Sequence, residues 1–498
     1  MGQSRLEDQL HRLMQQTFGV KLGIGKVALP CRIRQGSCMV DVPVIKLVSA
    51  MQHLLAHCPT KILPGATWAQ EHLAFWEQYR LEVPTHPVFT DHGDHLGRCI
   101  PISLHGDEGR GAGKSGFLVV NVSPNFCQGR SSLLSRIVLL GLPSKAYVVH
   151  AKRNRMFEAT LHHLGAELLA GYTTGVAVPW LLSGPLYLVC TAVRGDWQFL
   201  QKALNLNRSY GHAASCHMCM ACRSGPFSFR NIKPDAPWRH AGIPTPWARE
   251  SGLVMQVPGL RHLAHVMVKP DILHMWHLGV ARDFMACSLI ELSSDYRGGI
   301  EARLRAVWGE FGDWAAVHKV RPLLTSFTKE NLHWKPRLWP CLNCKASDAI
   351  LFCRFIADAC GNQALHPLSR KNGLIAACSR AMDRLLEKLE DEGLFTRPSQ
   401  RSLLSGLGVV VVRSYMQLHV LSLQAGLQRY KLRPKFHMLV HMAEGLLLNS
   451  FNWRWDACWM DEDIVGKVSR LSRRVHPMTC ALRTLQRYML AMSRHWRD

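Results

Sequence analysis

The chain has 498 residues, of which 47% are hydrophobic and 19% are charged, so it can bury more than one core and has no long segment of disordered composition. Lys and Arg number 60 against 36 Asp and Glu, and a folded chain with a net charge of +24 is typical of proteins that bind a polyanion such as nucleic acid. The 17 cysteines are too sparse for a disulfide scaffold, and residues 1–20 lack the apolar core of a secretory leader. These two features exclude a small secreted protein and predict a cytosolic or nuclear one.

The N-terminal region, residues 1–95, is predicted to be mixed and mainly helical. The segments 49–57 and 67–82 read as helices. A passage rich in Pro, His, Asp and Gly follows them and ends the region.

The next region, residues 96–210, predicts an α/β core. Two apolar runs, 99–105 and 116–123, predict paired strands. Residues 153–172 predict an amphipathic helix, and the apolar run 185–193 predicts a strand buried on both faces. Strands and helices around a buried strand are typical of an α/β domain.

An uncharged stretch at 168–193 is long enough to be compared with a membrane span. Its five glycines and prolines interrupt any single helix, so a helix end, a loop and a buried strand explain it better. No membrane partner is therefore predicted.

The second half of the chain changes character. Residues 211–280 form a Cys/His-rich segment that contains an Asp-x-x-His element, and nearly every segment of 281–450 predicts helix. Residues 451–498 predict C-terminal helices that complete the core.

The loop between the two paired strands allows two interpretations. Gly113, Lys114 and Ser115 match the end of a phosphate-binding loop, which makes a nucleotide hydrolase one alternative. The position five before Gly113 is Glu108 instead of glycine, and a strand follows where such a loop needs the N-terminus of a helix. The pattern favours a glycine-rich hairpin carrying Asp107, whose simplest role is that of a turn residue.

Three carboxylates lie where strands or helices present them. Asp107 follows the first paired strand, Asp196 follows the buried strand, and Glu462 lies at the start of a C-terminal helix. Gly466 and Ser469 would share a helix face with Glu462, and carboxylates beside small and basic residues suit Mg²⁺ and a phosphodiester. Taken alone, each carboxylate also suits a surface or capping role. The basic residues of this helix, expected to contact DNA phosphates, are Lys467, Arg470, Arg473 and Arg474.

Cysteine and histidine spacing predicts a zinc site. Cys216 and Cys219 form a C-x-x-C pair, which Asp271 and His274 could complete to a tetrahedral site, with His277 at helical spacing beyond them. The alternative is cysteines packed in a loop and histidines on a helix face.

Two further Cys/His patterns are weaker. Cys341 and Cys344 form a second pair. His437 and His441 share one face of a predicted helix, but Met438 stands where a HEXXH metalloprotease needs glutamate.

In chain order, these motifs resemble the CACTA (En/Spm-like) group of DDE transposases and the genes derived from them, over roughly residues 102–487. "PDILHMWHLGVARDF" looks like the family's Asp-x-x-His element, and "GDWQFLQKALNLNRSYGHAASCHMC" looks like its second catalytic aspartate followed by C-x-x-C. "RPKFHMLVHM" looks like the family's stretch before the final acidic residue, which then corresponds to Glu462 in "DEDIVG".

The resemblance implies an α/β fold in which an RNase H-like core carries a large all-α insertion, with a Cys/His zinc-type subdomain. It implies a structural Zn²⁺ and catalytic Mg²⁺ or Mn²⁺. The implied catalytic ligands are Asp107, Asp196 and Glu462, with Asp91 and Asp94 as alternatives for the first. The implied zinc ligands are Cys216, Cys219, Asp271 and His274.

The implied function is transposition, a form of DNA recombination, by two-metal strand cleavage and strand transfer in the nucleus. The implied partner is DNA, as transposon ends or as non-specific duplex, bound by a homo-oligomer. Departures from the family at Trp197, Gln198, Asp461 and Val465 keep two alternatives open. One is a catalytically silent derivative that binds DNA or a partner, and the other is a zinc-stapled RNA-binding protein.

Overall fold

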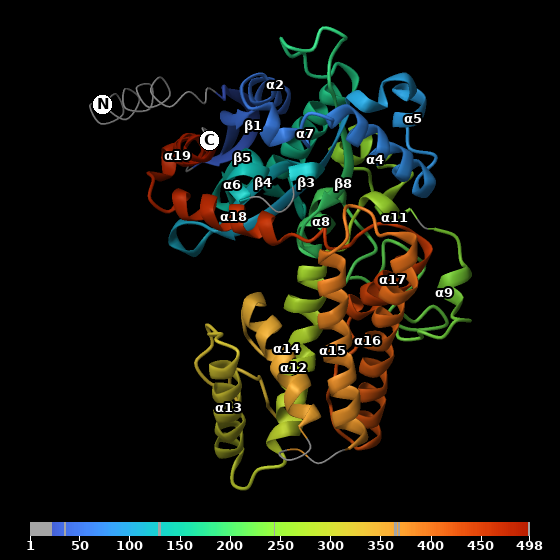
Figure 1. Ribbon diagram of the computed structural model, residues 1–498. Helices are drawn as coiled ribbons and strands as arrows, with labels where there is room; N and C mark the ends of the chain where they lie inside the picture. The colour runs from blue at the N-terminus through green and yellow to red at the C-terminus, as the bar shows by residue number, and fades with distance from the viewer. Residues whose placement is uncertain are drawn as a thin grey trace. The chain divides into compact units, whose positions relative to one another are not determined.

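The computed structural model of the protein describes residues 22–33, 36–127, 131–243, 245–362, 366 and 369–496 (Figure 1). The expectation that residues 1–20 carry no leader lies outside the described residues. The chain divides into two compact units, each of which is described by itself. The sheet unit comprises Met1–Arg208, Ile243–Lys269 and Cys458–Asp498, and the helical unit comprises Ser209–Gly242 and Pro270–Ala457. The predicted regions 211–280 and 451–498 thus each contribute to both units.

The sheet unit begins with an antiparallel hairpin of β1 (Ile24–Ile33) and β2 (Gly36–Ile45). Helices α2 (Leu47–His57) and α4 (Trp68–Glu82) follow, which confirms the helices predicted near 49–57 and 67–82. The hairpin itself was not predicted from the sequence.

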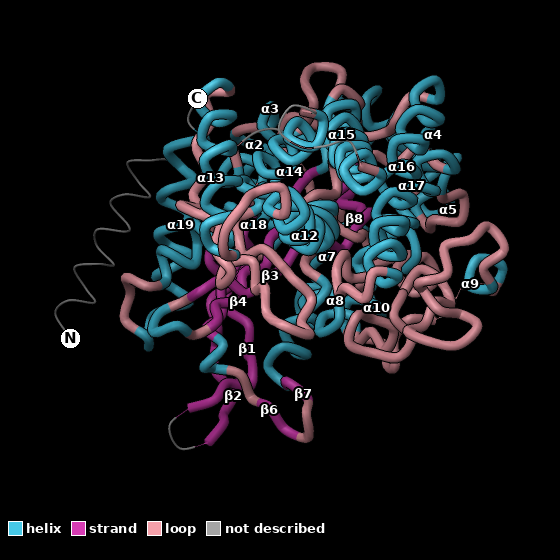
Figure 2. The backbone as a smooth tube through the Cα atoms, turned by 90° about the horizontal axis from the view of Figure 1, so that it is seen from below, coloured by secondary structure: helices cyan, strands magenta, loops and turns pink. Residues whose placement is uncertain are grey.

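The central sheet has four strands, in the order β5-β4-β3-β8. Strand β3 (Cys99–Arg110) pairs antiparallel with β4 (Gly116–Pro124), which pairs antiparallel with β5 (Ile137–Pro143). The crossover through α7 (Arg155–Thr173) returns the chain to β8 (Tyr187–Arg194), which lies parallel to β3. Figure 2 shows β3, β4 and β8 in magenta among the helices. The predicted paired strands, amphipathic helix and buried strand are therefore confirmed, and the fold is mixed α/β.

Helices cover both faces of this sheet. A Cβ added to Gly106 of β3 would lie 2.2 Å from Phe199 of α8 (Trp197–Leu204), whereas one added to Gly109 would lie 2.0 Å from Ser469 of α18 (Trp459–Ser472). Side chains alternate between the faces of a strand, so Asp107 shares the face of Gly109, toward α18. Helix α19 (Cys480–Trp496) packs against β5 and α18.

The helical unit is built from long helices packed side by side. Helix α15 lies between α14 and α16, and α17 packs against α16 (Figure 1). Its main helices are η5 (Leu273–Val280), α12 (Ala281–Ser293), α13 (Ile300–Val317), α14 (Ala346–Gly361), α15 (Arg370–Glu390), α16 (Pro398–Gln424) and α17 (Pro434–Leu448). The π-helical η5 carries the Asp-x-x-His element at its start.

Short elements connect the larger ones. They are α3 (Pro59–Ile62), α5 (Val88–Asp91), η1 (Gly93–Arg98), η2 (Ala112–Lys114), η3 (Asn125–Cys127), α6 (Ser132–Ser135), η4 (Ser144–Ala146), β6 (Val149–His150), β7 (Arg153–Asn154), α9 (Pro237–His240), α10 (Gly252–Gln256), α11 (Ala264–Met267) and η6 (Pro477–Thr479).

The uncharged stretch at 168–193 is divided between the end of α7, a loop and β8, as predicted. Among the described residues, one helix, α16, is long and apolar enough to cross a membrane by length and composition alone. The core helix of a soluble protein passes the same test, and 44% of the apolar window of α16 is buried inside the structure.

Candidate functional site

Two buried cysteines form one half of a candidate metal centre in the helical unit. Cys216 and Cys219 lie in the irregular segment before α9, and both are buried. The backbone N–H of Met218 donates to Sγ of Cys216 over 3.2 Å, and that of Ala221 donates to Sγ of Cys219 over 3.4 Å. Hydrogen bonds from backbone amides stabilise thiolates and orient them, as outer partners of a metal ligand do.

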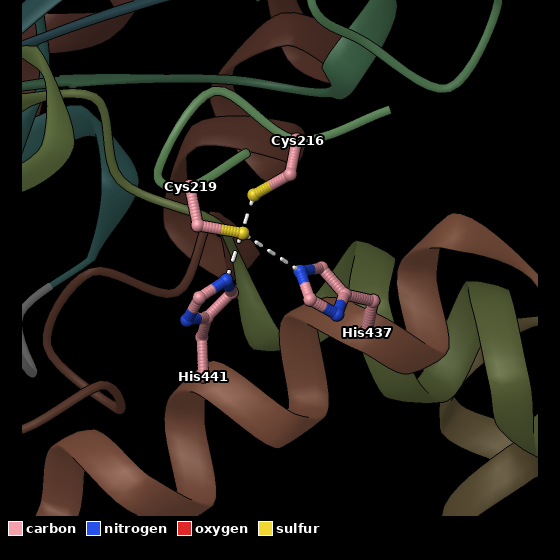
Figure 3. Close-up of side chains that lie close together, drawn as sticks. All are labelled: Cys216, Cys219, His437 and His441. Carbon is pink, nitrogen blue, oxygen red and sulfur yellow. Dashed lines mark hydrogen bonds between the residues drawn. The ribbon is translucent and has the colours of Figure 1, made fainter. Parts of the chain in front are cut away.

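Two histidines of α17 supply the other half (Figure 3). Nε2 of His437 lies 3.2 Å from Sγ of Cys219, and Nε2 of His441 lies 3.5 Å from Sγ of Cys216. In a tetrahedral zinc site, Zn–S and Zn–N bonds of the usual lengths separate sulfur from nitrogen by about 3.5 Å. The four ligand atoms all lie within 4.8 Å of one another, so the group can hold a zinc ion.

The protonation of this group also suits a metal. Burial lowers the pKa of His437 to about 4, so its imidazole is neutral, as a metal ligand must be. The hydrogen bond with Cys216, aided by His437 and His441, lowers the pKa of Cys219, whereas burial raises the pKa of Cys216. Cys219 therefore gives up its proton more readily than Cys216, and a bound Zn²⁺ would displace the proton of a cysteine that is still protonated.

An aromatic side chain packs against the centre. The Trp238 ring meets the rings of His437 and His441 edge-on, with centroid distances of 4.5 and 5.5 Å. Nε1 of Trp238 donates to the carbonyl of Asn231 over 2.7 Å, which fixes the indole. The Trp238 ring packs against both imidazoles, of which His437 is buried and His441 is half-buried.

The structure places the other two predicted zinc ligands elsewhere. Nδ1 of His274 hydrogen-bonds to Oδ2 of Asp271 over 2.5 Å, and Oδ1 of Asp271 accepts from the backbone of Leu273 over 2.9 Å. Asp271 therefore caps the start of η5. His437 and His441 take the places expected for Asp271 and His274. Their H-x₃-H spacing is a zinc-ligand pattern in its own right, and this signal could have identified them.

No other group of three or more Cys, His, Asp or Glu ligand atoms within the described ranges is close enough to hold a metal ion. The second cysteine pair, Cys341 and Cys344, has no such companions there. Burial raises the pKa of Cys341 to about 11, so its thiol is protonated near neutrality.

The predicted catalytic carboxylates belong to the sheet unit. Asp107 lies on β3, and Asp196 follows β8. His105 of β3 is paired with Arg194 of β8, so Asp107 and Asp196 each lie two residues beyond the same paired position. Oδ1 of Asp196 accepts from the backbone of Phe199 over 2.6 Å and caps α8. Glu462 lies in the first turn of α18, and all three side chains are half-buried.

The alternatives for the first acidic ligand lie outside the sheet. Asp91 ends α5, where its carboxylate accepts from the Tyr172 hydroxyl over 2.8 Å. Asp94 lies in η1, and both residues are exposed. Of the three candidates, Asp107 is the one carried by a strand of the central sheet.

Asp461, which was not predicted as a site residue, is fully buried beside Glu462. Nε and an outer nitrogen of Arg136 bind its two oxygens at 2.7 and 3.1 Å, and Arg194 approaches one oxygen to 3.8 Å. Burial alone would raise the pKa of Asp461, but these two guanidinium groups, with His105, hold it well below its usual range.

The predicted phosphate-binding residues lie on α18 or directly after its end at Ser472, and their surroundings differ. Nζ of Lys467 lies 2.6 Å from Oδ2 of Asp463, and Nε of Arg473 donates to the carbonyl of Arg110 over 2.7 Å. Arg470, Arg473 and Arg474 are exposed and can reach a polyanion.

The glycine-rich loop joins β3 to β4 as a hairpin. The backbone N–H of Gly111 donates to the carbonyl of Ser115 over 2.7 Å, and β4 begins at Gly116. A strand therefore follows Gly113, Lys114 and Ser115, and the helix N-terminus on which a phosphate-binding loop depends is absent from the described stretch 116–124.

Comparison with known proteins adds no relative: no family model and no curated protein matches the chain.

Proposed function

We propose that the chain is a transposase-like DNA-binding protein in which Asp107, Asp196 and Glu462, described residues whose carboxylates are not gathered into a metal-holding group in this structure, would draw together on Mg²⁺ or Mn²⁺ for DNA strand cleavage and strand transfer. The observation that carries this proposal is the common register of Asp107 and Asp196. His105 of β3 is paired with Arg194 of the parallel neighbour β8, and each aspartate lies two residues after its own member of this pair. Helix α18, which bears Glu462, packs on β3.

The strand order supports an RNase H-like core. The consecutive strands β3, β4 and β5 are antiparallel, and a crossover then leads to β8, which lies next to β3 and parallel to it. Val268 forms a further parallel bridge to Val193 of β8, at the place of a fifth strand. The segment 270–457, which belongs to the helical unit, interrupts the sheet unit before α18, as a large insertion would.

The chemistry follows from the donor set. Metal ions held by the carboxylates would activate water or a 3′-hydroxyl and stabilise the leaving oxygen of a phosphodiester. The exposed Arg470, Arg473 and Arg474 would bind the DNA backbone without reading its sequence. Zn²⁺ held by Cys216, Cys219, His437 and His441 would tie the irregular Cys-rich segment to α17 and so have a structural role.

A second candidate is a catalytically silent derivative that binds DNA alone. The carboxylate of Asp196 accepts a 2.6 Å hydrogen bond that caps α8, so this residue has a structural use independent of metal. The silent derivative would retain the fold, the zinc group and the positive charge.

The test is Mn²⁺-dependent nicking of supercoiled plasmid by the full chain. We expect the parent to nick and the Asp107→Asn, Asp196→Asn and Glu462→Gln variants to lose nicking while retaining zinc and their melting temperature. Matched controls are Glu108→Gln, on the opposite face of β3, and Asp463→Asn, next to Glu462. Both controls should nick.

The other outcomes discriminate between the candidates. A parent chain that binds duplex DNA tightly without nicking it would favour the silent derivative. Preference for RNA over DNA in a competition assay would argue against both candidates.

A further inference from the structure

A polar layer lies between the central sheet and α18. Nδ2 of Asn121 on β4 lies 3.1 Å from Nδ1 of His105 on β3, and Arg194 of β8 donates to the Ser123 hydroxyl over 2.7 Å. The Asp461 carboxylate enters this layer from the first turn of α18. Three strands therefore contribute groups to the layer in which Asp461 is held.

Arg136, which directly precedes β5, makes the closest contacts with Asp461. Its guanidinium binds both carboxylate oxygens, and neither side chain of the pair is exposed to solvent. Taking both charges out of water is costly, and a buried ion pair can often be replaced by apolar residues without loss of stability. Stability alone is thus a poor explanation for this pair, whereas two-point binding fixes the rotation of α18 about its axis.

Contacts further along α18 show that the helix follows β3. Asp461 meets Arg194, whose backbone position is paired with His105 of β3, while Ser469 packs on Gly109 and Arg473 donates to the carbonyl of Arg110. The helix rises about 12 Å from Asp461 to Ser469, at 1.5 Å per residue. The strand rises about 13 Å from His105 to Gly109, at about 3.3 Å per residue. The two rises agree, which places Glu462, one residue beyond Asp461, near the level of His105 and about 5 Å short of Asp107 along the strand.

We propose that Asp461, held by Arg136 and Arg194, is a positioning residue that sets the rotation and height of α18 and thereby delivers Glu462 to Asp107 and Asp196. The catalytic role of Glu462 in this inference rests on the proposed function, but the position of α18 relative to β3 can be measured whether or not the protein cleaves DNA.

The test uses Asp461→Glu and Asp461→Asn in the full chain. Asp461→Glu retains the paired charge but is longer by one methylene group, about 1.5 Å, so it should fold and hold zinc like the parent while displacing α18. A misplacement of about 1 Å can cost about a hundredfold in rate. We therefore expect nicking by Asp461→Glu to fall by about that factor, the Mn²⁺ concentration for half-maximal rate to rise, and DNA affinity to remain unchanged.

The second readout is the distance between spin labels on α18 and β3. Labels attached through genetically encoded azide side chains at the exposed positions Arg470 and Arg110 avoid the 17 native cysteines. We expect the distance distribution to shift or broaden in both Asp461 variants and to stay unchanged in Asp463→Asn, a matched neighbour on the same turn.

Two outcomes would overturn the proposal, namely parent-like label distances in both variants or parent-like nicking by Asp461→Glu at every Mn²⁺ concentration. If the parent does not nick, the proposed catalysis fails, and the label distances alone decide whether Asp461 places α18.

Discussion

Several ionisable side chains in this protein are buried away from water, and a neighbouring side chain sets the protonation state of each. Burial lowers the pKa of His437 beside Sγ of Cys219, and Arg136 and Arg194 lower the pKa of the buried Asp461. Unpaired, such groups would lose several kcal/mol each on burial, so their partners decide which protonation state is populated.

The zinc ligands can be separated from their neighbours by substitution. We expect Cys219→Ala and His437→Ala to lower zinc affinity by more than about a hundredfold, because removing a ligand costs more than removing one of its outer partners. Asp271→Asn and His274→Gln are the matched controls and should retain the metal. The measurement is zinc content after dialysis against a graded chelator. Loss of zinc from Asp271→Asn and His274→Gln, with zinc retained by His437→Ala, would restore the ligand set expected from sequence.

His366 should make stability depend on pH. Burial disfavours its charged form, but Glu310 and Asp295, which hydrogen-bond to its two ring nitrogens at 3.2 and 2.7 Å, outweigh burial and raise its pKa. The native state therefore binds the proton more tightly than the unfolded state does. The stabilisation is complete below the unfolded pKa of about 6.5 and is lost as pH rises through the folded value.

The free energy of unfolding in urea, measured from pH 5.5 to pH 8, tests this expectation. The difference between the parent and His366→Gln should be largest at the acid end and shrink as pH rises. The exposed His318→Gln variant should follow the parent at every pH. A difference that grows with pH would show that the folded pKa of His366 is lowered.

At the scale of elements, helices approach the sheet where a side chain is missing. Phe199 of α8 lies over Gly106, and Ser469 of α18 lies over Gly109, on opposite faces of β3. The missing Cβ atoms allow close contact between helix and strand, so two glycines three residues apart set the positions of two helices.

Gly109→Ala should displace α18. The added Cβ would lie 2.0 Å from Oγ and 2.9 Å from Cβ of Ser469, and 3.0 Å from Cγ1 of Val465. Overpacking of this kind costs about 1–3 kcal/mol, and we expect that loss in urea unfolding together with slower nicking. Adding Ser469→Gly should recover part of both.

The matched control is Gly93→Ala, where an added Cβ has no atom within 4 Å. Equal losses in Gly93→Ala and Gly109→Ala would contradict the close approach of α18 to β3.

The whole molecule carries a net charge of +24, and its effect on DNA binding depends on where the charge lies. Each phosphate contact releases counterions, so the logarithm of affinity falls with the logarithm of salt concentration by about 0.9 per contact. A basic protein without a defined site would lose affinity equally whichever arginines were removed.

The arginines at and directly after the C-terminal end of α18 should therefore contribute more to DNA binding than other arginines do. Replacing Arg470, Arg473 and Arg474 with Gln should make the slope of log affinity against log salt concentration less steep by up to about 2.7, because three phosphate contacts contribute about 0.9 each. The control removes the same charge from exposed positions of the helical unit, at Arg305, Arg384 and Arg413. Equal slopes in the two triple variants would contradict a DNA-binding face on α18.

Local pattern in the sequence determined much of the architecture. The apolar runs that became β3, β4 and β8 and the amphipathic run that became α7 are signals contained within about twenty residues each, and they predicted the elements correctly. The β1–β2 hairpin escaped prediction because residues 36–41 of β2 are all exposed, so they show no alternation of apolar and polar residues.

Only the tertiary structure decided which distant residues meet. The C-x-x-C pair predicted a zinc group, but Cys219 and His437 are 218 positions apart, and spacing within a motif carries no information across such a distance. Asp461 and Arg136 are 325 positions apart, and in the sequence Asp461 is one more carboxylate in an acidic turn. Folding alone brought a guanidinium to that carboxylate, because a charge buried beneath α18 is tolerated only where a partner reaches it.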